Sequence, residues 1–156
     1  MKIFLALFFS VTILISSSAK ALEKGKWSFV KTDEYCYIGS LAIESDLSPT
    51  KNRGDYYVLV YKNIGNPDTV VQIEAGYDYK VGPDIIVKID KGDYKFYTTE
   101  DLPTAAWTNE DSKVIFAMKK GLKLVVIGES SRGTVTNDIY TLKGFTSAYN
   151  NLTKDC

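Results

Sequence analysis

The sequence contains no histidine, and this absence removes the commonest routes to nucleophilic catalysis. Ser-His-Asp and Cys-His arrangements activate a weak nucleophile through an imidazole ring, which this chain does not have. A zinc site is also disfavoured, because the chain offers only two cysteines and no histidine as ligands. We therefore expect no catalytic residues, no bound metal and no cofactor.

An excess of positive charge is absent as well. The chain has 19 basic and 19 acidic residues, and two of the basic ones, Lys2 and Lys20, precede residue 22. Nucleic acids and anionic membrane surfaces bind proteins that gather a basic excess on one face, so both are poor candidate partners. The short basic clusters at residues 51–53 and 119–123 are typical of solvated loops and helix ends.

Only one long hydrophobic run occurs, at residues 3–15. It follows Lys2 and precedes a serine-rich stretch that ends at Ala21, a layout typical of a Sec-type signal peptide cleaved after Ala21. A transmembrane anchor is the alternative, but the run falls short of the ~20 apolar residues that span a bilayer. We expect residues 1–21 to be a signal peptide. Residues 22–156 then form a single domain that is periplasmic, envelope-associated or secreted, with no transmembrane segment.

The chain has only two cysteines, Cys36 and the last residue, Cys156. In an exported protein an even pair of cysteines is typical of a disulfide, because the periplasm and the extracellular space are oxidising. Free or metal-binding cysteines are the alternative. The predicted disulfide would tie the C-terminus to the first strands.

Runs of aromatic and β-branched residues, bounded by turn residues, predict strands along most of the chain. A polar stretch at residues 45–54 and a turn at residues 63–68 separate some of these runs. The expected strands are residues 27–30, 35–43, 56–62, 69–77, 85–89, 94–99, 122–128 and 134–142.

Two segments show helical patterns instead. Residues 109–121 begin with Asn109 as the expected N-cap and end with two lysines before Gly121. After Gly144, residues 145–152 place apolar side chains at the spacing of one helix face. No regular alternation of strand and helix occurs. The sequence therefore predicts a mostly β fold, an antiparallel β-sandwich or open barrel of about eight to nine strands with two short helices.

Two features bear on catalysis. Residues 128–133, GESSRG, approach the G-x-S-x-G nucleophile motif, but Arg132 stands where the motif requires glycine. We interpret this stretch as a hairpin turn in which Ser130, Ser131 and Gly133 are turn residues. Acidic residues are numerous but scattered, so a glycosidase-like envelope hydrolase with paired carboxylates is only an alternative function.

Tyrosine is abundant, with eleven residues in the chain. Tyrosine offers a large contact area with a polar tip and is enriched at interfaces. On neighbouring expected strands, Tyr56, Tyr61, Tyr77 and Tyr79 are our candidate binding surface. The alternative is that these rings fill the half-buried strands of a small sandwich.

Several fragments have an order and spacing that together carry a family likeness. They are residues 25–27 (GKW), 36–38 (CYI), 73–80 (IEAGYDYK), 106–107 (AW), 117–121 (AMKKG), 130–134 (SSRGT), 138–145 (DIYTLKGF) and the terminal Cys156. Through them residues 25–156 resemble the invasion-associated locus B (IalB) family of exported bacterial proteins. Ile139 and Thr141 stand where the family pattern often has Thr and Ser.

The resemblance implies a mostly β protein of the periplasm or envelope with no established enzymatic activity, and it transfers no functional residues. Together with the missing catalytic set, it predicts a non-catalytic binding or envelope-interaction module. The expected partner is an envelope protein, a glycan or an outer-membrane component.

Overall fold

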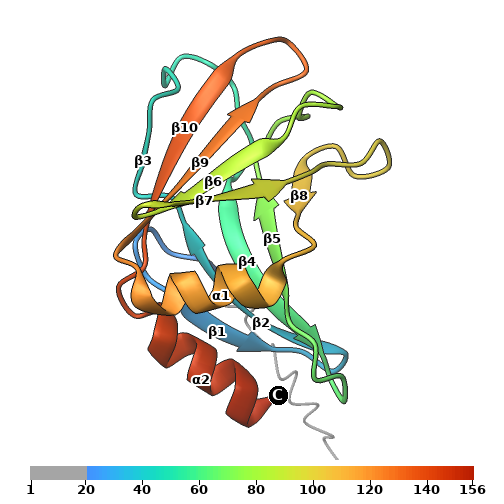
Figure 1. The fold of residues 1–156 in the computed structure, drawn as a ribbon, viewed down its shortest axis with the longest axis vertical. Helices are drawn as coiled ribbons and strands as arrows, with labels where there is room; N and C mark the ends of the chain where they lie inside the picture. Colours follow the sequence, from blue (N-terminus) through green and yellow to red (C-terminus); the bar gives the residue numbers. More distant parts are fainter. Residues whose placement is uncertain (1–20) are drawn as a thin grey trace, which may run out of the picture.

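A computed structural model describes residues 21–156 and contains ten strands and two helices (Figure 1). The predicted signal peptide falls almost entirely outside these residues. In chain order the elements are β1 (Ser28–Lys31), β2 (Tyr35–Leu41), β3 (Glu44–Ser45), β4 (Tyr57–Asn63), β5 (Val70–Glu74), β6 (Ile85–Ile89), β7 (Gly92–Phe96), β8 (Ala105–Trp107), α1 (Asp111–Lys120), β9 (Lys123–Glu129), β10 (Val135–Thr141) and α2 (Phe145–Asp155).

The strands form two five-stranded antiparallel sheets that face each other as a sandwich. The first sheet has the order β1-β2-β4-β5-β8 and the second has the order β3-β10-β9-β6-β7. The chain leaves β2 in the first sheet and enters β3 in the second within three residues, which forms one corner. At another corner an antiparallel bridge joins Tyr97 to Trp107. The mostly β sandwich predicted from the sequence is confirmed.

The two helices cover one end of the sandwich. In Figure 1, α1 crosses the lower part of the molecule and α2 lies beneath it; α2 also contacts β1 and β2. Trp27 packs edge-on against Phe145 of α2, with ring centroids 4.9 Å apart. Within residues 21–156, no helix is long and apolar enough to cross a bilayer.

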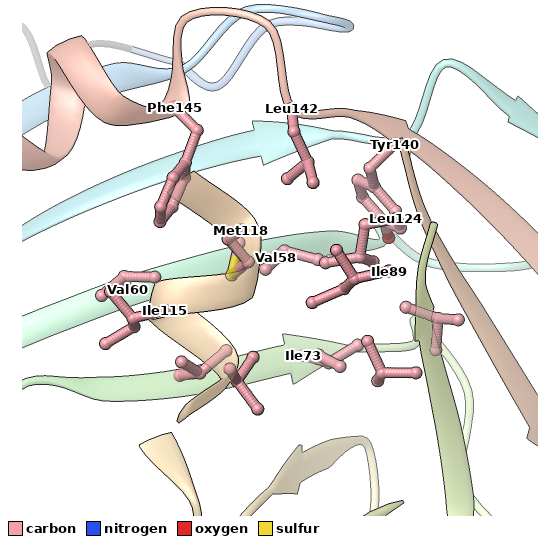
Figure 2. Close-up of a cluster of buried hydrophobic side chains, with 14 of the residues drawn as sticks. Val58, Val60, Ile73, Ile89, Ile115, Met118, Leu124, Tyr140, Leu142 and Phe145 are labelled. Carbon is pink, nitrogen blue, oxygen red and sulfur yellow. The ribbon is translucent and has the colours of Figure 1, made fainter. Parts of the chain in front are cut away.

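The core lies between the sheets and extends under α1. Alternate residues of each strand point inward, so strands from both sheets contribute branched aliphatic side chains. Figure 2 shows these side chains meeting residues of α1 and the start of α2. The labelled members are Val58, Val60, Ile73, Ile89, Ile115, Met118, Leu124, Tyr140, Leu142 and Phe145.

Two short strands escaped sequence prediction because they are too short to show a period of two. The strand β8 has three residues, and β3 has two residues at the edge of the stretch expected to be a loop. The expected strand at residues 69–77 also ends early, at Glu74. Gly76 turns the chain there with a φ of 69°, and a Cβ at this position would collide with the carbonyl oxygen of Gly54.

The start of α1 also differs from expectation. The N-cap residue is Glu110 rather than Asn109, and no side chain caps the helix. The carboxylate of Asp111 instead accepts the backbone N–H of Val71 at 2.7 Å, which ties the first turn of α1 to β5. The helix start is therefore set by a tertiary contact rather than by a local cap.

The C-terminus is fixed by two contacts. A disulfide joins Cys36 of β2 to Cys156, with the Cα atoms 6.0 Å apart. The amine of Lys31 donates to the carbonyl oxygen of Asp155 at 2.8 Å. Both contacts hold the end of α2 against the first sheet.

Candidate functional site

The four tyrosines of the candidate binding surface do not share one place. Tyr61 lies on the outer face of β4, which points away from the second sheet. Tyr56 and Tyr77 pack on the guanidinium of Arg53. Tyr79 is 2% exposed and belongs to the core. Only Tyr61 thus belongs to the outer face of the first sheet.

A different set of tyrosines gathers on that outer face. Tyr35 and Tyr37 come from β2, and Tyr57 and Tyr61 come from β4. The strand register places Tyr37 directly opposite Tyr61, and the rings of Tyr35 and Tyr37 stack with centroids 6.1 Å apart. Cross-strand aromatic neighbours of this kind form a continuous apolar surface.

These four tyrosines line a shallow hollow of about 620 Å³, which we call the tyrosine groove. Leu22 and Leu59 supply apolar surface and close over Gly39, whose missing side chain leaves room for them. Asn63 and Gln72 add amide groups to the lining. The groove therefore combines flat rings with a few hydrogen-bonding groups.

Three phenols of the groove have a raised pKa. Burial raises the pKa of Tyr37, Tyr57 and Tyr61 above the usual value of 10.0. The neighbouring Glu74 and Asp55 raise the pKa of Tyr57 further. The hydroxyls of Tyr37 and Tyr57 are thus protonated near neutral pH and can both donate and accept hydrogen bonds.

A buried ion pair joins Arg53, in the connection between β3 and β4, to Asp138 of β10 in the second sheet. The guanidinium of Arg53 binds both carboxylate oxygens of Asp138, with Nη2–Oδ2 at 2.6 Å and Nη1–Oδ1 at 2.8 Å. The two side chains are only 6% and 4% exposed. Burial tends to lower the pKa of Arg53, but the hydrogen bonds and charge of Asp138 outweigh it and raise the pKa.

Two further N–H donors of Arg53 are bound nearby. Its Nε donates to the carbonyl oxygen of Ala75 at 2.5 Å, and its Nη1 also donates to Ser45 Oγ at 3.3 Å. The rings of Tyr56 and Tyr77 lie 3.8 and 4.8 Å from the guanidinium carbon. This arrangement connects the β3–β4 segment to β10 and uses most of the Arg53 donors within the protein.

Sequence reasoning did not find this ion pair, although one signal was present. In β10 the alternation places Thr136, Asp138 and Tyr140 on the buried side. A carboxylate at a core-facing position needs a cationic partner. The partner, Arg53, lies 85 residues away in a stretch expected to be a solvated loop.

The deepest tyrosines give a measurable pH dependence. Burial raises the pKa of Tyr79 and Tyr140 well above 10.0, so the folded protein keeps both protonated. The unfolded chain releases these protons near pH ~10, and the free energy of unfolding is expected to fall as the pH rises above that value. Alkaline spectrophotometric titration should leave two phenols un-ionised until the protein unfolds. Ionisation of every tyrosine in the folded state would contradict this, and Tyr79→Phe should remove one phenol from the protected class.

The serine stretch forms a turn, as interpreted from the sequence. The Ser130 N–H donates to the carbonyl oxygen of Thr134 at 2.8 Å, and Ser130 Oγ accepts the Thr134 N–H at 3.1 Å. Ser130 is 8% exposed, so its hydroxyl serves the β9–β10 turn. A cleft of about 680 Å³ lies beside this turn, and Asp78 is the one carboxylate residue in its lining.

The tyrosine groove likewise has one carboxylate residue, Asp55, in its lining, while Glu74 lies beside Tyr57 on the same face. Within residues 21–156, no three Cys, Asp or Glu side chains come together as a metal site would require. Neither hollow contains the facing pair of carboxylates that glycoside hydrolysis uses.

Comparison with known proteins finds a matching family and a similar solved structure. The family model described as invasion associated locus B (IalB) protein matches residues 31–153. The chain is also similar to the crystal structure of invasion associated protein B from Bartonella henselae, with a TM-score of 0.57 and 17% identity over 83% of this chain and 92% of that chain. At this identity the similarity concerns the fold alone. No curated protein matches the chain. Because the family model spans most of the sequence, the chain belongs to the invasion associated locus B family.

Proposed function

We propose that this protein is an exported, envelope-associated binding module that carries out no catalysis and holds a glycan chain in the tyrosine groove. The observation that carries the proposal is the set of four tyrosines on the outer face of β2 and β4. The N-terminal sequence pattern and the disulfide support export, because disulfides persist in oxidising compartments.

The chemistry of the groove favours a glycan as its ligand. A pyranose ring has apolar C–H faces, which pack on the electron-rich faces of aromatic rings, and a rim of hydroxyl groups. The rings of Tyr37 and Tyr61 offer adjacent apolar surfaces, and Asn63 and Gln72 offer amides for the hydroxyls. The shallow form of the groove suits a chain that passes across it.

The carboxylates near the groove support binding rather than hydrolysis. A general acid of a glycosidase is held protonated by an apolar environment. Asp55 is exposed to solvent, and Glu74 lies at the margin beside Tyr57. We therefore assign these two residues to the polar rim of the groove and not to an acid–base pair.

Co-sedimentation with purified peptidoglycan sacculi and with lipopolysaccharide tests this proposal and separates two envelope sources of pyranose chains. We expect the protein to bind one of them, and Tyr37→Ala combined with Tyr61→Ala to weaken binding by about thirtyfold, as loss of a central interface contact of ~2 kcal/mol does. Tyr97→Ala, at an exposed tyrosine outside the groove, serves as the matched control and should bind as the unmodified protein does.

Two results would contradict the proposal. The first is equal binding by the unmodified protein and the tyrosine variant, with both shown to be folded by circular dichroism. The second is release of new reducing ends from the glycan during incubation, abolished by Asp55→Asn or Glu74→Gln, which would support the hydrolase instead.

A further inference from the structure

Two exposed apolar side chains and several exposed lysines occur in the segments that meet where α1 ends and β9 begins. Phe116 is 59% exposed and Leu122 is 81% exposed, the two largest exposures among the large apolar residues of the described chain. We call this surface the basic apolar patch. Its members are Phe116 and Leu122 together with Lys91, Lys119, Lys120, Lys123 and Lys143.

Backbone contacts bring these separate segments together. The carboxylate of Asp90 accepts the N–H groups of Leu122 and Lys123 at 3.2 Å, which places the β6–β7 turn with Lys91 beside them. The Leu142 N–H donates to the carbonyl oxygen of Leu122 at 2.9 Å, which brings the start of the β10–α2 connection alongside. Figure 1 shows the end of α1, the β6–β7 turn and this connection meeting at one side of the molecule.

The charge of the patch is largely uncompensated. None of its five lysines forms an ion pair with any residue in the described part of the chain. Asp90 is the acidic group next to the patch, and its carboxylate is already hydrogen-bonded to backbone N–H groups. The local charge is therefore positive, although the domain as a whole has slightly more acidic than basic residues.

The lysine side chains also lie along aromatic rings. The ammonium of Lys120 is 4.1 Å from the centroid of the Phe116 ring, and that of Lys119 is 4.0 Å from the centroid of the Tyr149 ring. Both ammonium groups therefore lie on aromatic faces, which places positive charge and apolar surface side by side. The patch is thus amphipathic at the level of individual side chains.

We propose that the basic apolar patch docks the protein on an anionic lipid surface. Phe116 and Leu122 would enter the boundary between headgroups and acyl chains, while the lysines contact the phosphates. The net charge of the sequence argued against such a surface, but the fold gathers lysines 52 residues apart in the chain into one place. This inference is independent of the proposed glycan binding, because the patch and the tyrosine groove share no residue.

Vesicle co-sedimentation of the mature, oxidised protein tests the inference. We expect binding to vesicles of phosphatidylglycerol with phosphatidylcholine, no binding to phosphatidylcholine alone, and loss of binding at high salt. Lys120→Gln combined with Lys123→Gln should weaken binding about 25-fold, since each lysine near the surface contributes about a factor of five. Phe116→Ala combined with Leu122→Ala should weaken binding without loss of charge.

Lys51→Gln combined with Lys154→Gln is the matched control, because it removes the same charge from exposed lysines outside the patch that form no ion pair in the described part of the chain. The inference is overturned if this control weakens binding as much as the patch variants do, or if the protein does not distinguish the two kinds of vesicle. Because all substituted side chains are exposed, thermal unfolding of each variant should match that of the unmodified protein. Retention of glycan binding by the patch variants would separate this surface from the tyrosine groove.

Discussion

Asp138→Ala is expected to lower the free energy of unfolding by about 3–5 kcal/mol, the cost of leaving one buried charge without its partner. The guanidinium of Arg53 would then stay in the core at 6% exposure with no carboxylate to bind. The β3–β4 segment would also lose the contact of Arg53 to β10, while Asp46 keeps its hydrogen bonds to Asn137. Urea denaturation of the oxidised protein, followed by circular dichroism, measures the change.

Two control variants separate charge burial from other effects. Arg53→Met combined with Asp138→Leu removes both charges and should recover much of the lost stability, because the desolvation penalty disappears with the pair. Asp84→Ala breaks a 2.8 Å ion pair with Lys95 at the surface and should change stability far less. A loss below about 1 kcal/mol for Asp138→Ala would contradict the account of this ion pair.

Cys156→Ser is expected to lower the free energy of unfolding by about 4–5 kcal/mol in the chain-entropy model. The disulfide closes a loop of 120 residues, so the oxidised unfolded chain is strongly restricted relative to the reduced one. The reduced unmodified protein should unfold at the same urea concentration as Cys156→Ser. Intact mass with and without a thiol-alkylating reagent measures the oxidation state in the same samples.

The structural consequence of this substitution should be local to the helical end. Amide hydrogen exchange is expected to speed up in α2, whose end is held by Cys156 and by the Lys31 contact to Asp155. Strands β9 and β10 should keep their protection in native conditions. Unchanged stability on reduction, or both cysteines alkylated in the native exported protein, would be incompatible with a disulfide that fastens the C-terminus.

The strand pattern, the two helices and the sandwich class could be read from the sequence because alternation and turn residues are local signals. The β9–β10 turn was interpretable from its serines and glycine, and Gly144 marked the start of α2. The missed elements, β3 and β8, exist only through pairing with β10 and β5. Such short strands leave no periodic signal of their own.

The tyrosine groove could be located from the sequence only in part. Tyr57 and Tyr61 are four residues apart, so strand alternation alone places them on one face, with Tyr56 on the other. Their neighbours Tyr35 and Tyr37 could not be assigned without the register between β2 and β4. The set chosen from the sequence therefore shares only Tyr61 with the tyrosine groove and includes the core residue Tyr79.

Contacts between charged residues that are far apart in the chain could not be predicted from the sequence either, because they also depend on how distant segments pack. Arg53 and Asp138 meet across 85 residues, and Lys91 reaches the end of α1 through the hydrogen bonds of Asp90. Net charge describes the whole chain and not the face on which charges gather. Both the buried pair and the basic apolar patch are products of the fold.

The most direct test of the central claim is chemical-shift mapping of the isotope-labelled mature protein during titration with soluble peptidoglycan fragments and with lipopolysaccharide-derived oligosaccharide. The account predicts shifts concentrated at Tyr35, Tyr37, Tyr57, Tyr61 and Gln72 for one of these ligands, with β9 and β10 unaffected. Shifts confined to the cleft beside Ser131 and Asp78, or no shifts with either ligand, would contradict it.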